Sequence, residues 1–158
     1  MNNKLIFLFI CLSINLCGQN INKIRKSVSK INVEVNYQIK IVNNDYFVEN
    51  RNEITDNGQE LIGFYKNNNL KKMTHEIGLS NKKIVIQYYF VEERLIFVLE
   101  KNYITIDENG YLKTPKLLSE RRVYFQNQKI IKETNPDLIN KVDYLKESEI
   151  LKIDLLKN

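Results

Sequence analysis

The chain has 158 residues, of which 43% are hydrophobic and 27% charged, with only 5 glycines and 2 prolines. This composition excludes an intrinsically disordered chain, and the length suffices for one domain with its own core. The net charge of +5 fits solubility or a nearby anionic surface. It is too small to predict a nucleic-acid partner.

Residues 1–18 form a predicted export signal. Lys4 supplies the charged start, and the apolar run of residues 5–16 has the length of a signal-peptide core and is short for a membrane span. Gly18, with Leu16 two positions before it, favours cleavage before Gln19. The sequence therefore predicts an exported protein, periplasmic or secreted.

Both cysteines, Cys11 and Cys17, lie in this leader. A lipoprotein anchored at Cys17 is an alternative to plain secretion, but Leu16 stands where a lipidation motif has a small residue. An uncleaved anchor is a further alternative. After cleavage before Gln19 the chain keeps no cysteine, so it can form no disulfide, and we predict no membrane span in it.

An amphipathic helix is predicted from Gln19 to about Asn32, because apolar residues recur there at helical spacing with cations on the other side. Over residues 31–42 two patterns compete. Strict alternation predicts a strand, whereas another subset of residues continues the helical face, and both interpretations stay open. The apolar face of the helix consists of Ile21, Ile24, Val28 and Ile31.

Residues 43–45 predict a turn, residues 46–48 a first strand and residues 56–58 another turn. The stretch Glu60–Lys101 then predicts antiparallel hairpins, around which the chain is organised. Two aromatic residues, four mostly polar residues and a Leu or Ile recur three times, which is the hairpin signal. The aromatic pairs are Phe64-Tyr65, Tyr89-Phe90 and Tyr124-Phe125, and the residues that close the pattern are Leu70, Leu95 and Ile130.

The repeat resembles the tyrosine-rich hairpin repeats of MORN-type and related bacterial antitoxin-like proteins. More closely, the layout resembles a family of small secreted bacterial proteins with a signal peptide, a helix with an Ile-Arg pair (Ile24-Arg25) and hairpins ending in Tyr-Tyr-Phe and Leu-x-Phe-Val. These motifs stand here at residues 88–90 and 95–98, followed by residues 122–125. At the turns, residues 68–69, 93–94 and 128–129 replace the usual Gly. The resemblance implies a fold and export, and no activity.

Beyond Lys101, the sequence predicts a short strand at residues 103–106, a turn at 107–110, a loop at 111–119 containing Pro115 and a third hairpin at 119–133. Asn135 and Pro136 then predict the start of a C-terminal helix, either continuous or in two segments. We therefore expect an α+β fold in a single domain, residues 19–158. It is an antiparallel β-meander of about five to seven strands with an N-terminal and a C-terminal helix packed on it.

Catalytic residue types are sparse. His75 is the only histidine, and a structural role for it outweighs a role as general base beside Glu76 or Glu100. One histidine without a mature cysteine cannot form an ordinary zinc site. The acidic pairs at residues 92–93, 107–108 and 147/149 predict no glycosidase pair, because neighbours on a strand point to opposite faces. We predict no cofactor, no metal site and no catalytic residue.

The sequence favours a non-catalytic exported module that binds a protein partner or a cell-envelope component through the open face of the sheet. The alternatives are an envelope-polymer hydrolase with carboxylates assembled by the fold, and an immunity- or antitoxin-like inhibitor. If both helices cover the face to which Phe90 and Phe97 point, Tyr89 lies on the open face. The predicted partner-binding residues, of types enriched at hot spots, are Phe64, Tyr89, Tyr124, Lys72, Arg94 and Arg122. Alternatively, these rings form a second small core under the 103–119 loop.

Overall fold

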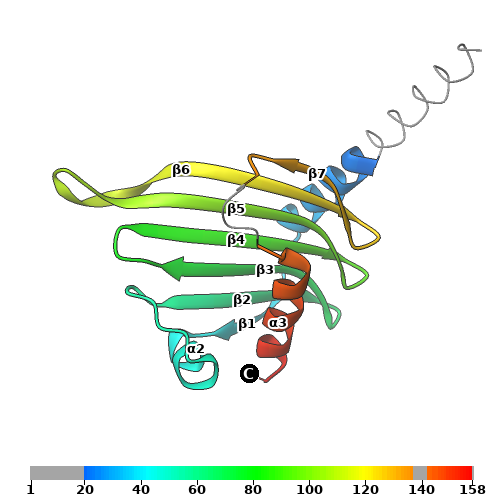
Figure 1. Ribbon diagram of the computed structural model, residues 1–158. Coiled ribbons are helices and arrows are strands. Elements are labelled where there is room, and N and C mark those ends of the chain that lie inside the picture. Colours follow the sequence, from blue (N-terminus) through cyan, green and yellow to red (C-terminus); the bar gives the residue numbers. More distant parts are fainter. Residues whose placement is uncertain (1–19, 137–141, 158) are drawn as a thin grey trace, which may run out of the picture.

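The computed structural model describes residues 20–136 and 142–157. It shows one antiparallel sheet of seven strands in chain order (Figure 1), so the predicted α+β meander with a helix at each end is confirmed. The N-terminal helix covers residues 20–33. The other elements are β1 (Gln38–Val42), α2 (Asn44–Arg51), β2 (Gln59–Lys66), β3 (Asn69–Gly78), β4 (Lys82–Val91), β5 (Arg94–Asp107), β6 (Gly110–Gln126), β7 (Lys129–Thr134) and α3 (Tyr144–Lys157).

Each copy of the sequence repeat forms one hairpin with a two-residue turn. In the β2–β3 hairpin the turn residues Asn67 and Asn68 have φ angles of 51° and 62°. Two consecutive positive φ angles are the mark of a type I′ turn, whose twist matches that of the flanking strands. The equivalent turn residues, Glu92-Glu93 and Asn127-Gln128, also have positive φ. The turns therefore lie at residues 67–68, 92–93 and 127–128. Each lies one residue earlier than the positions 68–69, 93–94 and 128–129 at which the resembling family has Gly.

A β-bulge follows each of these turns at the same place in the repeat. In β4–β5, Phe90 pairs with Leu95 and Tyr89 pairs with Phe97, so Ile96 has no partner residue. The same one-residue shift separates the two aromatic residues of the other copies, leaving Lys71 and Ile131 without partner residues. Because a bulge adds one residue to one strand, it changes which side chains of that strand share a face.

The bulges bring the first aromatic residue of each repeat into one line across the sheet. Phe64 pairs with Lys72, Lys72 with Tyr89, Tyr89 with Phe97, and Phe97 with Tyr124. We call these five residues the aromatic row. The prediction that Phe64, Tyr89 and Tyr124 share a face is confirmed by this register. The expectation that Phe97 lies on the face opposite Tyr89 is wrong, because the bulge at Ile96 shifts its phase.

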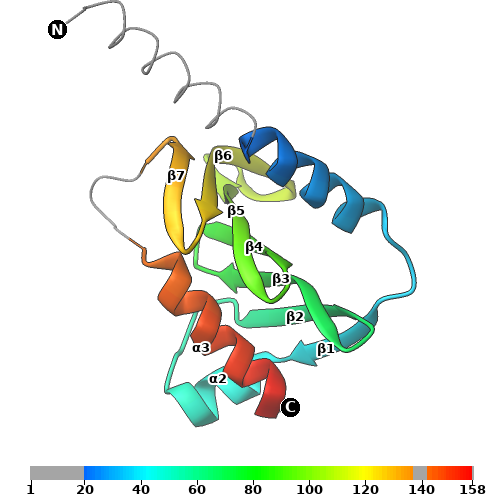
Figure 2. The same cartoon turned by 90° about the vertical axis from the view of Figure 1, so that its right-hand side faces the viewer.

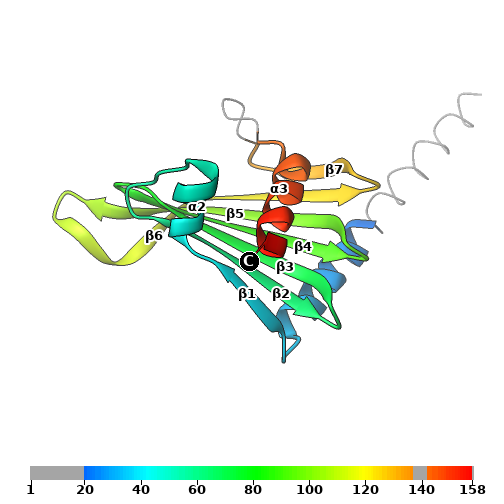
Figure 3. The same cartoon turned by 90° about the horizontal axis from the view of Figure 1, so that it is seen from below.

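The two terminal helices lie on opposite faces of the sheet (Figures 2 and 3). The N-terminal helix packs Ile24 and Ile31 against Tyr89, Phe97 and Tyr124. Helices α2 and α3 cover the other face, over a larger core that contains the second aromatic residues of two repeats and the inner side of α3. The condition that both helices share a face is therefore not met, and Phe90 and Phe97 are buried in different cores.

Helix α3, which corresponds to the second part of the predicted C-terminal helix, spans Tyr144–Lys157. Asn135 has φ 52°, in the left-handed region, and the helix begins at Tyr144. The carboxylate of Asp143 caps it by accepting the Lys146 backbone N–H at 3.2 Å. The predicted first turns at 137–141 lie outside the described residues. Helix α3 packs closely over β2 at Gly63, where a Cβ would lie 2.8 Å from Leu155 Cδ1. This close packing therefore depends on the glycine.

Two other segments differ from the sequence predictions, and a third decides between two predictions that the sequence left open. Residues 46–48 belong to α2 and not to a strand, because Asn43 caps that helix by accepting the Tyr46 N–H. The segment 111–119 belongs to β6 and not to a loop. Pro115 is tolerated there because it falls in an irregularity of the β5–β6 ladder. Over residues 31–42 both patterns hold in turn, since the helix ends at residue 33 and β1 begins at Gln38.

The packing of the aromatic row predicts the cost of truncating its central ring. Phe97→Ala removes a side chain that is 6% exposed and contacts the rings of Tyr89 and Tyr124. We expect a loss of roughly 3–5 kcal/mol in the free energy of unfolding, measured by urea denaturation. The control Ile41→Ala, at a side chain that is 55% exposed, is expected to cost at most about 0.5 kcal/mol. Equal midpoints for the two variants would show that the row is not core.

Candidate functional site

The N-terminal helix is fixed to the sheet at both ends. Near its start, Asn20 Nδ2 donates to Gln126 Oε1 at 2.9 Å. Beyond its end, Lys66 forms an ion pair with Glu34 at 2.9 Å, and the Tyr37 hydroxyl donates to the Ile31 carbonyl at 2.8 Å. These contacts hold the helix above the aromatic row and leave a hollow along each of its sides.

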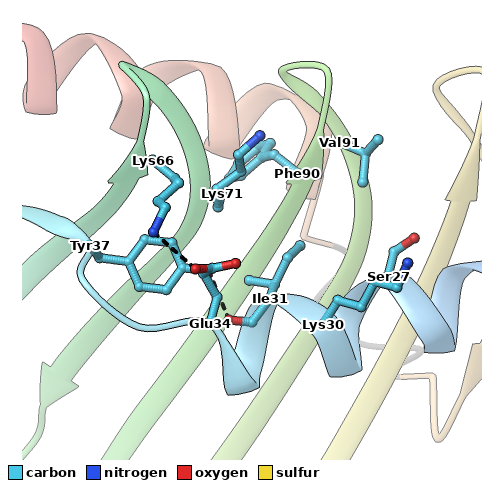
Figure 4. A pocket seen from close by; sticks show the side chains of 9 residues that line it. All are labelled: Ser27, Lys30, Ile31, Glu34, Tyr37, Lys66, Lys71, Phe90 and Val91. Atoms are coloured by element: carbon cyan, nitrogen blue, oxygen red, sulfur yellow. Dashed lines mark hydrogen bonds and ion pairs between the residues drawn. The ribbon is translucent and has the colours of Figure 1, made fainter.

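The hollow on the β2–β3 side, shown in Figure 4, is the smaller of the two, with a volume of about 210 Å³. Lys66 and Glu34 meet inside it, and the hydrogen bond from Lys66 lowers the pKa of the Glu34 carboxyl. Tyr37 closes one end, with its ring edge against Phe64 at 5.9 Å between centroids. The side chains in this hollow serve mainly to anchor the helix.

The hollow on the other side opens toward β4, β5 and β6 and has a volume of about 380 Å³. We call it the helix–sheet groove. Its floor comes from the sheet, where three rings lie side by side at tilted angles: Tyr89 and Phe97 lie 5.6 Å apart between centroids, and Phe97 and Tyr124 lie 4.9 Å apart. Leu99, the neighbour of Arg122 across β5 and β6, extends the floor. The helix wall consists of Arg25, Val28, Ser29, Asn32 and Val33.

Polar contacts tie the floor of the groove to the helix. The hydroxyl of Tyr89 donates to Asn32 Oδ1 at 3.1 Å, and burial raises the pKa of that hydroxyl. The Arg25 guanidinium lies over the Tyr124 ring, 5.9 Å from its centroid. Arg122 lies at the opposite rim and pairs with Glu120 at 2.6 Å. The groove therefore has an apolar floor with a cation at each rim.

The structure gathers five of the six predicted partner-binding residues around this helix. Tyr89 and Tyr124 lie on the floor, 1% and 2% exposed, and Arg122 lies on the rim. The Lys72 ammonium sits between two rings, 5.5 Å from Phe64 and 5.3 Å from Tyr89, and burial lowers its pKa. Tyr89 and Tyr124 thus belong to a second small core, which the N-terminal helix covers and the 103–119 segment does not, whereas Phe64 stays half-buried.

Arg94 lies apart from this group, exposed at the start of β5. Sequence reasoning missed the helix residues of the groove, above all Arg25. Helical spacing predicts that Arg25 points away from the sheet, with the other cations of the helix. Arg25 directly follows the buried Ile24, however, and so lies at the edge of the apolar face. Phe97 was missed because the bulge at Ile96 has no signal in strand periodicity.

On the other face, His75 is a buried packing residue. Its side chain is 4% exposed, its Nε2 lies 3.0 Å from Gln59 Oε1, and its ring stacks on Phe47 at 5.4 Å. Burial, with a smaller contribution from the nearby Arg51 cation, lowers the pKa of His75 to about 4. The imidazole is therefore neutral at physiological pH and enclosed in the core of this face.

A second polar group on that face fastens α3 to the sheet. The Tyr144 hydroxyl donates to Glu100 Oε2 at 2.5 Å, and Arg121 Nε donates to Glu133 Oε1 at 2.5 Å. The Arg121 guanidinium also lies over the Tyr144 ring at 5.2 Å. Burial, then the hydrogen bond to Glu100, raises the pKa of Tyr144. The carboxylates of Glu100 and Glu133 both accept hydrogen bonds in this group, which holds α3 against the strands.

The acidic pairs named from the sequence lie in separate places. Glu92-Glu93 is the β4–β5 turn, Asp107 ends β5 at the far tip of the β5–β6 hairpin, and Glu147 and Glu149 lie on α3. Within residues 20–136 and 142–157, no three His, Cys, Asp or Glu side chains gather as metal ligands would. None of the helices in that part of the chain is long and apolar enough to cross a membrane.

The burial of His75 predicts a specific acid sensitivity. The folded chain keeps His75 neutral down to about pH 4, whereas the unfolded chain takes up a proton below its usual pKa of 6.5. The contribution to stability is therefore complete above pH 6.5 and is lost as the pH falls toward 4. Between pH 7 and pH 4.5 the loss is roughly 2–3 kcal/mol from this one group.

The matched variant is His75→Gln, which can still hydrogen-bond Gln59 and does not titrate. Urea unfolding at both pH values is expected to show a smaller loss of stability on acidification for the variant than for the wild type. Carboxylates titrate equally in both proteins and cancel. An identical pH dependence, or an imidazole titration near pH 6.5 by NMR, would contradict the assignment.

Comparison with protein-family models, with curated proteins and with solved structures finds no match for this chain. The resemblance of its hairpin repeat to tyrosine-rich bacterial repeats therefore stays a prediction.

Proposed function

We propose that this protein is an exported, non-catalytic binding module, and that it holds a small amphiphilic component of the cell envelope in the helix–sheet groove. The observation that carries the proposal is the groove itself. It is an apolar hollow of about 380 Å³ with arginines at its rims. Ligand sites of about 300–1,000 Å³ with apolar linings and a few placed polar groups are typical of small-molecule binding.

The groove is formed before any ligand arrives. Its helix wall is held to the sheet by the Asn20–Gln126 hydrogen bond and the Lys66–Glu34 ion pair, and its floor consists of buried rings on the central strands. A preformed site loses little conformational entropy when a ligand binds, which favours affinity. The face that the sequence analysis expects to be open is covered by the N-terminal helix, so the proposed site is the flank of that helix instead.

The titratable groups support binding over catalysis. His75 is buried on the opposite face, and Glu100 and Glu133 are held by Tyr144 and Arg121. The residues that line the groove include two arginines and two tyrosines but no acid, histidine or cysteine. They supply contacts and charge and lack a general base. No observation among the described residues favours the hydrolase or the inhibitor alternative.

The test compares two substitutions of serine on the same helix. Ser29→Trp places a large ring in the mouth of the groove, whereas Ser27→Trp places the same ring in the hollow of Figure 4 on the other side. Each protein is incubated with a lipid extract of the envelope, and bound small molecules are identified by mass spectrometry after gel filtration. We expect recovery with wild type and Ser27→Trp, and loss with Ser29→Trp.

Circular dichroism checks that both variants are folded. Equal recovery with the two variants would show that the ligand does not enter the groove. Recovery of no small molecule from any of the three proteins would overturn the proposal. Recovery of a bound protein without any small molecule would also overturn it.

Export is the second part of the proposal and rests on Lys4 and the apolar run of residues 5–16. We expect the protein recovered outside the cytoplasm to begin at Gln19, as measured by intact-mass spectrometry. A mass that includes Cys17 with acyl chains would replace secretion by lipid anchoring, and a full-length mass would contradict cleavage.

A further inference from the structure

Arg25 is the cation in the groove that is available to a ligand. Its guanidinium rests over the Tyr124 ring, 5.9 Å from the centroid, and no carboxylate in the described part of the chain forms an ion pair with it. Arg122, across the groove, is already paired with Glu120 at 2.6 Å. Because an arginine presents five donors, Arg122 keeps donors beyond that pair, but Arg25 offers its whole fork.

The charge of the groove has one sign. No Asp or Glu lines it, and the helix that forms its wall contains no acid from residue 20 to residue 33. A ligand cation would meet the unpaired Arg25 guanidinium, whereas an anion would meet that guanidinium and the remaining donors of Arg122, whose own charge is offset by Glu120. Hydrogen bonds between ionised partners are shorter and roughly twice as strong as neutral ones. The electrostatics therefore select for an anionic group.

Between the two arginines the groove is apolar. Val28 from the helix and Leu99 from β5 pack against the cluster that contains Phe97, and the polar groups of this stretch are the Ser29 hydroxyl, the Asn32 amide and the hydroxyls of Tyr89 and Tyr124. The Asn32 oxygen is already occupied by the Tyr89 hydroxyl. The volume of about 380 Å³ equals roughly a dozen waters at ~30 Å³ each. That space suits one short apolar chain and is small for a two-chain lipid.

We propose that the groove binds a single-chain anionic amphiphile, with its carboxylate on Arg25 and its apolar chain along Val28, Phe97 and Leu99. This inference rests on the proposed function and names the ligand class of the same site. Arg122 serves as a second donor at the opposite rim. The protein binds one ligand molecule at a time, between the helix and the sheet. A ligand that comes from a membrane therefore leaves the membrane completely when it enters the groove.

The experiment titrates the purified protein with three probes that share one chain and differ in head-group charge: decanoate, decanol and decyltrimethylammonium. Isothermal titration calorimetry is run below the micelle concentration of each probe. We expect one site for decanoate and affinities at least about tenfold weaker for decanol and for the cation, since a charged hydrogen bond supplies that factor. Equal affinity for decanoate and decanol would overturn the inference.

Two neighbouring substitutions separate the groove from general charge. Arg25→Gln removes the cation over Tyr124, and we expect decanoate affinity to fall about tenfold with decanol affinity unchanged. Lys26→Gln removes one charge at the next position, where the side chain is exposed and lies outside the groove. It is expected to leave both affinities within about twofold. Equal losses in the two variants would show non-specific attraction and overturn the inference.

Two further measurements separate failure of the inference from failure of the proposed function. If decanoate does not bind while Ser29→Trp still abolishes recovery of an envelope molecule, the groove is a site for another ligand class. Sedimentation with anionic phospholipid vesicles tests the other source of the same chemistry. Vesicle binding that Arg25→Gln weakens, without binding of monomeric decanoate, would show that the groove reads a membrane surface, which overturns the monomer proposal.

Discussion

The one-residue bulge behind each hairpin turn is the constraint on which the rest of the structure depends. Type I′ turns fix the end of each hairpin, and strand alternation places the two aromatic residues of each repeat on opposite faces. The bulge on the following strand then sets which residue of that strand lies beside the first aromatic residue. Because this happens three times in register, Phe64, Tyr89 and Tyr124 lie in one line with Phe97 between the last two. The line creates an apolar strip on a face whose next rows are largely polar or half-exposed.

That strip determines where the N-terminal helix lies. The helix has one narrow apolar face, and the aromatic row offers a matching width of buried surface, so Ile24 and Ile31 settle onto the rings. The opposite face carries the second aromatic residues and a wider core, which α2 and α3 cover together. Each face of the sheet therefore has its own cover, and neither helix has to span both.

The groove follows from a mismatch between these parts. A helix is about 10–12 Å across, and the face of the sheet is broader, so the rows beside the aromatic row stay partly open. Leu99 and Arg122 are the first neighbours left uncovered on the β5–β6 side, and Arg25 reaches over the strip from the helix. The same packing that buries the rings thus leaves an apolar hollow with cations at its rims.

The sequence by itself determined the features that depend on local spacing. Alternation of side chains and repeated aromatic pairs predicted the meander and the shared face of Phe64, Tyr89 and Tyr124, and 3.6-residue spacing predicted the N-terminal helix. Only the tertiary structure decided the phase of Phe97, the strand at 111–119, the helix at 46–48 and the face that each terminal helix covers. Bulges and helix placement depend on pairing and burial between segments far apart in the chain, and Arg25 became a groove residue only when the helix and the sheet came together.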